Sequence, residues 1–471
     1  MRSKITLLFA AALLALPVSA QDDGTDAVSG ATRNDGFRER LKAELLEELR
    51  AELADGTPEP EGKKTARAEK APRLTIGGYG EAVMSRNFYS DNYLRYFNPE
   101  NYKNDKSHGR FDLPHVVVYI GYDFGRGWSV GTEIEFEHGG TESAYEIEYE
   151  EGGEYESEVE RGGEVALEQF WIQKSFSRAA NLRIGHMIVP VGATNMHHLP
   201  TEFFGVYRPE GENTILPCTW HETGIGFWGE AGAWRYEAMF LPGLDSDRFG
   251  NNVWIAGGAG SPYEFKIGNA YAGAFRIDNF SVRGLRLSLS GYAGNTFSNT
   301  LSANRLSKDA YAGAKGTVLL GAFDFLYDDR NWVIRGNFDY GHLSDADVIT
   351  KFNLNLPQAS PSPKQHVGSD AIATGLEAGY DFFALSKKLH ASGQRFYLFG
   401  RYEYYDSMYR TAPSIVRQEW CGRQRVAAGI NYYPIKNIAI KAEYSVGLLK
   451  SPFNNEPALS LGIAYSGIFK R

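Results

Sequence analysis

The chain has 471 residues, enough for several soluble domains or for one large barrel. A formal net charge of -9 argues against nucleic-acid binding, which needs a basic surface. Mean hydropathy is -0.37, and beyond residue 20 no apolar run reaches the roughly 18 residues of a transmembrane helix. Aromatic residues make up 14% and glycine numbers 52, a composition that favours a β-barrel with aromatic belts.

Residues 1–20 have the pattern of a secretory signal peptide. Arg2 and Lys4 form a short basic start, an apolar run covers 5–16, and small residues precede a cleavage site after Ala20. The pattern predicts export, and it leaves 21–36, rich in Gly and Asp, as a disordered start of the mature chain.

Residues 37–54 are predicted to form a short amphipathic helix. Leu41, Leu45, Leu49 and Leu53 recur every four residues among charged side chains. A coiled coil between subunits and a helix that frays in solution both fit this stripe. Residues 55–72, rich in Pro, Glu, Lys and Ala, are interpreted as a linker.

From residue 73 to 471 the sequence alternates with period two, which predicts β-strands with one apolar and one wet face. Thr132, Ile134 and Phe136 share one parity, and glutamates occupy the other. About 16 such segments are predicted, beginning near Leu74, Leu113, Ser129, Val165, Asn181, Thr223, Trp234, Tyr271, Leu285, Val318, Trp332, Gly375, Phe396, Val426, Ile438 and Ala458.

The connections between these segments alternate between short and long, with one exception near Lys387. Short turns at one end and long loops at the other are typical of a transmembrane antiparallel β-barrel in the outer membrane of a Gram-negative bacterium. The last segment places Leu461, Ile463 and Tyr465 on one parity, which resembles the signal read by barrel-assembly machinery. Expected partners are therefore that machinery, outer-membrane lipid and lipopolysaccharide.

Charged residues on the opposite parity are predicted to face the lumen, and a lumen with both signs of charge is polar and wet. Pairing of these charges across strands is the alternative interpretation, and both are expected for different members. The candidates are Arg276, Arg286, Arg335, Arg395, Arg401, Arg425, Lys441, Glu133, Glu135 and Asp339.

The third long loop, 189–222, is too apolar and aromatic for an extended outer loop, so we expect it to fold into the barrel and narrow the pore. His197, His198, His221, Glu202 and Glu222 could form a metal site, but their spacing matches no zinc signature, and packing inside the constriction is predicted instead. No metal or cofactor is expected. The candidate constriction residues are Asn195, His197, His198, Glu202, Tyr207, Arg208 and Glu222.

Four stretches around this loop carry a family resemblance: LRIGHMIVPVG at 182–192, EFFG at 202–205, YRPEGENTILP at 207–217 and WHETG at 220–224. They resemble the phosphate-selective porin O/P family in its Bacteroidota-type branch. The resemblance implies a 16-stranded barrel, usually trimeric, with the third loop folded inward and with anion or phosphate passage. The loop contains Arg208 but no lysine, so a general porin and an anion channel both remain open.

Passive diffusion of small hydrophilic solutes or ions through a water-filled barrel is the function that these patterns favour. An adhesion or ligand-binding barrel that uses its long loops is the alternative. An outer-membrane barrel enzyme needs a placed nucleophile and base. With 10 histidines and no such constellation in the sequence, the chain is predicted not to be an enzyme.

Overall fold

The computed structural model describes residues 73–105, 107–138, 143–149, 155–161, 165–260, 266–299, 311, 313–358 and 360–470. The predicted signal peptide, disordered start, amphipathic helix and linker, which together cover 1–72, lie outside the described residues. Within the described residues no helix has both the length and the apolar character to cross a membrane.

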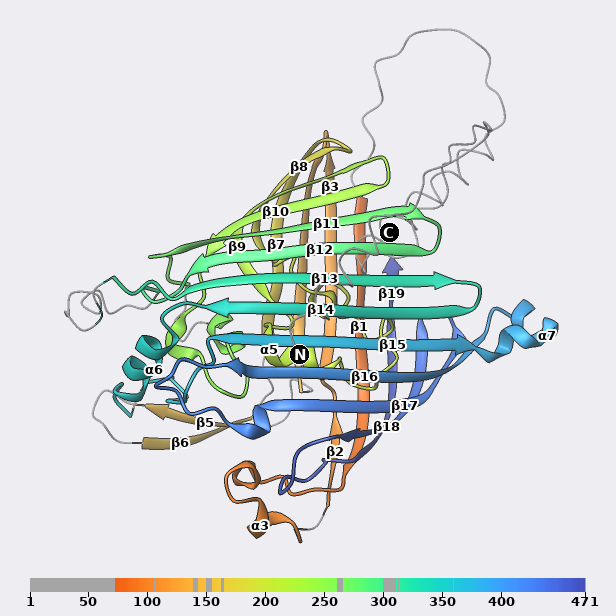
Figure 1. Cartoon of the computed structure of the whole chain (residues 1–471). Helices are drawn as coiled ribbons and strands as arrows, with labels where there is room; N and C mark the ends of the chain where they lie inside the picture. The colour runs from red at the N-terminus through yellow and green to blue at the C-terminus, as the bar shows by residue number, and fades with distance from the viewer. Residues whose placement is uncertain are drawn as a thin grey trace, which may run out of the picture.

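One antiparallel sheet closes on itself to form the barrel (Figure 1), because its last strand pairs with its first. The wall segments are β1 (Arg73–Asn87), β2 (His108–Asp112), β3 (His115–Gly125), β4 (Trp128–Glu137), β7 (Val165–Ser177), β8 (Ala180–Ile188), β9 (His221–Ala231), β10 (Trp234–Pro242), β11 (Tyr271–Val282), β12 (Leu285–Asn295), β13 (Thr317–Asp329), β14 (Trp332–Leu343), β15 (Asp370–Asp381), β16 (Arg395–Arg410), β17 (Gly422–Ile435), β18 (Ile438–Gly447) and β19 (Ala458–Lys470).

These 17 segments make 16 strands around the barrel, because β2 and β3 both pair with β1 along successive stretches. The break between them falls at Leu113 and Pro114, and proline cannot donate a hydrogen bond to the ladder. The predicted barrel of about 16 strands is therefore confirmed. The largest differences in strand starts are the strand made of β2 and β3, which begins at His108 rather than Leu113, and β15, which begins at Asp370 rather than Gly375.

Short turns join the strands at one end of the barrel. The turn between β13 and β14 is just Arg330 and Asn331, both with positive φ (52° and 68°), the conformation that suits a tight hairpin. The connection from β15 to β16 is longer and carries η6 (Phe382–Leu385) and α7 (Lys387–Ala391), the exception expected from the sequence.

The long loops at the other end carry the remaining elements. They are η1 (Tyr93–Tyr96) and α3 (Pro99–Tyr102), the hairpin β5 (Ser143–Tyr149) and β6 (Tyr155–Arg161), α4 (Ala193–Met196) and α5 (Glu210–Ile215), η2 (Ser246–Arg248) and η3 (Ala256–Ala259), α6 (Ala346–Leu354), and η7 (Glu419–Cys421).

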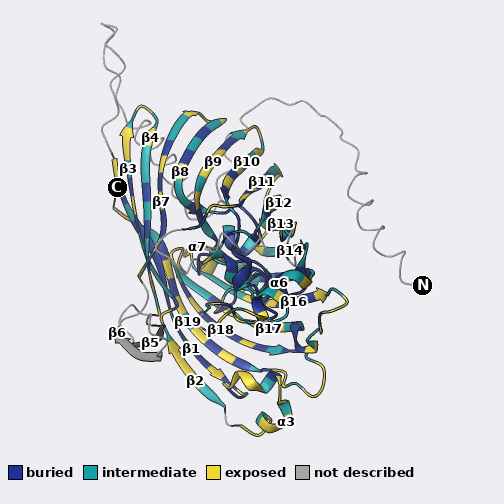
Figure 2. Ribbon diagram, turned by 90° about the vertical axis from the view of Figure 1, so that its left-hand side faces the viewer, coloured by how far each residue is buried: buried dark blue, intermediate teal, exposed yellow. Residues whose placement is uncertain are grey.

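The two faces of the wall differ in the sense expected for a membrane barrel (Figure 2). Along β11, buried and exposed residues alternate: Tyr271, Phe275 and Ile277 are exposed on the outside, while Arg276 and Asp278 at the alternate positions are buried on the inside. Apolar side chains outward and charged side chains inward reverse the order of a soluble protein and suit a lipid surround.

An apolar core lies within the barrel and is made by inward side chains of the strands together with side chains of the loops. Val189, Ile215 and Trp220 of the third loop pack in one cluster with Phe249 and Trp254 of the fourth. The expectation that the third loop folds inward is confirmed. The fourth loop fills the interior as well, which was not predicted.

Candidate pore constriction

The third loop, 189–220, crosses the lumen from β8 and is fastened to the far wall. Lys441 of β18 donates through Nζ to the carbonyls of Phe203 and Gly205, at 2.8 Å each. Asn431 of β17 donates through Nδ2 to Phe204 O at 2.8 Å. Three backbone carbonyls of the loop are thus held by side chains that arise some 230 residues later in the chain.

Asn195 links the two ends of the third loop by hydrogen bonds. Its Nδ2 donates to Val189 O at 2.6 Å, and its Oδ1 accepts from Trp220 N at 2.5 Å. Glu212 of α5 then accepts from the backbone N–H groups of Ala193 and Thr194 at 2.6 and 2.5 Å. Asn195 is fully buried, so its role is to tie the two ends of the loop together and not to line a channel.

Arg276 and Arg286 connect the loop to the near wall. Arg276 donates to Gly192 O at 3.1 Å and pairs with Asp278 at 2.8 Å. Both arginines also pair with Asp324 of β13 at 2.9 Å, and Arg286 contacts the His197 ring. Each cation is therefore matched by a carboxylate.

The remaining basic candidates are paired in the same way or are used by the loop. Arg401 is the most connected, with Glu403, Glu443 and Glu377 at 3.0, 3.4 and 3.5 Å. The others follow the same pattern: Arg335 with Glu377 at 3.2 Å, Arg395 with Asp381 at 3.2 Å, and Arg425 with Glu210 at 2.9 Å. Asp339 accepts from Asn337 at 2.5 Å.

An acidic face lines the wall formed by β1, β3, β4 and β7. Glu133 and Glu135 of β4 are both 3% exposed, and Glu133 accepts from Gln169. Glu168 of β7 is fully buried and accepts from Tyr79 at 3.2 Å. Arg208 of the third loop faces this wall, and the nearby Tyr79 and glutamates outweigh burial and raise its pKa.

Sequence reasoning missed Glu168, and a β-bulge is the reason. Glu133 pairs with Gln169 whereas Ile134 pairs with Leu167, so the register skips Glu168. Glu168 and Gln169 are both buried inside, which strict alternation does not allow. Sequence reasoning also missed Glu81 and Glu377. Both lie on the inward parity of their strands, so the alternating pattern could have identified them.

The histidines of the third loop are packed into the interior. His198 Nδ1 donates to Asn195 O at 2.9 Å, and its ring meets Tyr79 edge-on at 5.7 Å. Burial and the charge of Arg208 lower the pKa of His198 to about 3. His197 lies 3.8 Å from Glu202, and its pKa is also lowered by burial and by Arg286. Both imidazoles are therefore neutral at ordinary pH.

The other loop candidates lie apart from this group. Tyr207 is 38% exposed, and Glu222 pairs with Lys266 of the fourth loop at 2.9 Å. His221 and Glu222 are successive residues of β9, and His221 contacts His186 at 2.6 Å whereas Glu222 is buried inside. The five residues weighed as a metal site in the loop therefore do not converge.

No family model matches the chain. An uncharacterized protein of Aquifex aeolicus is 27% identical over 394 residues, which cover 82% of this chain and 78% of that protein.

Solved structures of other proteins are similar at low identity. A loop-deletion mutant of OmpT, an outer membrane protein of Vibrio cholerae, is 12% identical with a TM-score of 0.44, covering 84% of this chain and 100% of that chain. The outer membrane channel DcaP of Acinetobacter baumannii is 9% identical with a TM-score of 0.45, covering 85% and 99%. Salmonella typhi OmpF is 11% identical with a TM-score of 0.46, covering 84% and 97%.

Proposed function

We propose that the protein is an outer-membrane porin that allows passive diffusion of small hydrophilic solutes or ions. The observation that carries the proposal is the combination of a closed 16-strand wall, an apolar outer face and a charged interior into which the third loop folds, held by wall side chains. A barrel with this distribution satisfies its backbone within the wall and offers lipid an apolar surface, while its interior suits water and polar solutes.

The third loop is the proposed constriction. It is held at both ends of its crossing, by Arg276 at Gly192 and by Lys441 at Phe203 and Gly205. A segment fixed at both walls narrows the lumen permanently instead of opening and closing with each solute. Small solutes are therefore expected to pass and larger ones to be excluded by size.

The charge pattern favours a general porin with a modest preference for cations. The arginines of β11 to β17 named above are each matched by carboxylates, which weakens their attraction for an anion. The opposite wall carries Glu81, Glu133, Glu135 and Glu168, which are buried, and Glu137, which is half-buried and can be reached from the lumen. The phosphate passage implied by the family resemblance would need a different balance between basic and acidic side chains in the lumen. A reversal potential of cation sign in a KCl gradient supports this preference, and one of anion sign contradicts it.

Assembly is proposed to follow the same resemblance, as a homotrimer inserted by barrel-assembly machinery into a membrane that contains lipopolysaccharide. The outward apolar residues supply the surface for lipid and for neighbouring subunits. Cross-linking of the detergent-solubilised protein, read as trimers or monomers, tests the oligomeric state.

A liposome-swelling assay tests the proposed function. Liposomes that contain the folded barrel are expected to swell in isotonic solutions of small sugars, at rates that fall as the sugar becomes larger. Liposomes that contain heat-denatured protein are the control. Swelling no faster than this control, with folded barrel verified in the membrane, contradicts a diffusion pore.

A further inference from the structure

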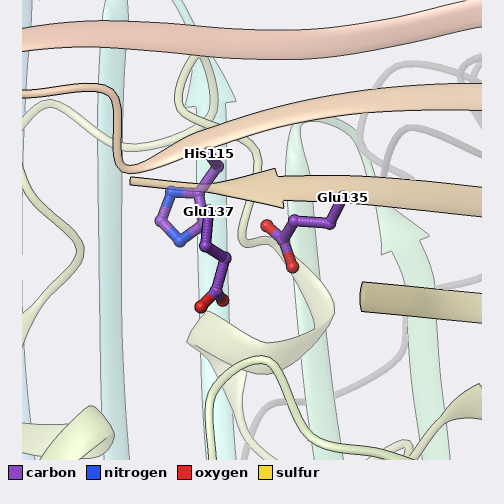
Figure 3. Close-up of side chains that lie close together, drawn as sticks. All are labelled: His115, Glu135 and Glu137. Atoms are coloured by element: carbon purple, nitrogen blue, oxygen red, sulfur yellow. The ribbon is translucent and has the colours of Figure 1, made fainter. Parts of the chain in front are cut away.

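We propose that His115, Glu135 and Glu137 form a binding site for one divalent transition-metal ion of the zinc class on the inner wall of the barrel. The three side chains come from the neighbouring strands β3 and β4, and one ligand atom of each lies within 4.8 Å of the other two. Figure 3 shows the carboxylate of Glu135 turned toward His115 and Glu137.

The sheet register brings these residues together. His115 is the direct cross-strand partner of Glu137, and Glu135 lies two residues before Glu137 on the same face of β4. One imidazole and two carboxylates make a donor set that suits zinc and its neighbours, at metal–ligand distances of about 2.0–2.2 Å. The strand ladder already holds the three backbones side by side, so side-chain movement alone would bring the three ligand atoms onto one ion.

Glu135 is the observation that points to a ligand. The residue is 3% exposed, and its Oε1 atom has no hydrogen-bond partner among the described residues. A buried carboxylate oxygen without a partner is costly, and a bound cation would remove that cost. His115 and Glu137 are half-buried, so an ion can reach the site from the lumen.

Glu81 of β1 orients the histidine for this role. Nδ1 of His115 lies 2.7 Å from Glu81 Oε1, and Glu81 is 8% exposed. A carboxylate that accepts from one ring nitrogen leaves Nε2 with its lone pair, the arrangement in which histidine ligates metals. Glu81 is therefore a positioning residue and the other three are the ligands.

Metal titration of the folded, detergent-solubilised barrel with any affinity tag removed tests the site. Zn²⁺ is expected to bind saturably at one equivalent in calorimetry, and Co²⁺ at the same site to give visible absorption. Glu135→Gln and His115→Ala should each weaken binding at least about tenfold, and Glu81→Gln about tenfold through the outer shell. His342→Ala is the matched control, because it removes a histidine that lies 3.1 Å from a single carboxylate, Asp370. It should bind like the wild type.

Two results overturn the proposal. One is the absence of saturable Zn²⁺ binding by the folded wild type. The other is equal binding by the wild type and by folded Glu135→Gln, since the ion would then be elsewhere. Folding of each variant is verified by the heat-dependent shift in its electrophoretic mobility. Because the readout is binding and not conductance, failure of this proposal is distinguishable from failure of the proposed pore.

Discussion

Lys441 shows how a charge on the inner wall can serve the loop instead of the solute. Its side chain is 3% exposed and both of its observed hydrogen bonds go to loop carbonyls, at 2.8 Å. Hydrogen bonds to a charged donor contribute about 1.5–3 kcal/mol each to stability. The residue therefore holds the third loop, the proposed constriction, in place, and we expect it to contribute little to attracting ions.

Replacing Lys441 with methionine should free the middle of the third loop. The variant keeps an apolar stem of similar length but loses both donors, so the carbonyls of Phe203 and Gly205 lose their partners. Single channels are expected to become noisier, with a larger mean conductance. Lys441→Arg keeps charge and donors and should resemble the wild type. A quiet Lys441→Met channel of unchanged conductance would show that the loop is held by other contacts.

His198 makes the loop sensitive to acid. Its folded pKa of about 3 lies below the ordinary value of about 6.5, because burial and Arg208 disfavour the charged ring. A lowered pKa means that the unfolded or released loop binds a proton that the packed loop does not. The stability of the packed loop is therefore complete above about pH 6.5 and falls as the pH drops toward 3.

Because the pKa of His198 is lowered, we expect the conductance to become unstable as the pH falls below about 6, between the ordinary and the folded pKa of this residue. His198→Asn cannot be protonated and should shift this change to lower pH. Measuring single-channel noise from pH 7 to pH 4 for both proteins decides the point. Identical pH profiles would remove His198 as the cause.

At the scale of elements, the strands were predictable and the loop contacts were not. Period two is a local signal, so strand starts were found to within about five residues at worst, as in β15. The bulge at Glu168 breaks that period and has no local signature. The fastening of Phe203 by Lys441 joins residues 238 apart, and no spacing in the sequence encodes it. The inward course of the loop was predicted from its apolar composition and from the family resemblance.

The outward face of the strands gives a prediction for membrane insertion. Ile440 of β18 is 45% exposed on that face, where lipid is expected. Ile440→Arg should destabilise the folded barrel by about 2–4 kcal/mol if it lies near the bilayer midplane. Leu448→Arg is a matched control, because Leu448 is 46% exposed but lies just beyond the end of the strand. Urea unfolding in phospholipid vesicles compares the two, and equal losses would argue against a lipid-facing wall at Ile440.

At the scale of the whole molecule, the wall of the barrel suits the membrane and its interior suits polar solutes. The wall is closed by the pairing of β1 with β19, so no sheet edge is left within the membrane. The interior is occupied at its loop end by the apolar core and is charged around the third loop. The acidic wall of β1, β4 and β7 and the paired arginines of the opposite side make the interior around the third loop polar, as the proposed diffusion pore requires.

The most direct test of the porin account is single-channel recording in planar bilayers with the purified, folded protein. The account predicts discrete upward steps of uniform size that persist at moderate voltage, and a larger step size once Lys441 is replaced with methionine. Bilayers that stay silent at high protein load, with folded barrel shown to be inserted, would contradict a water-filled pore.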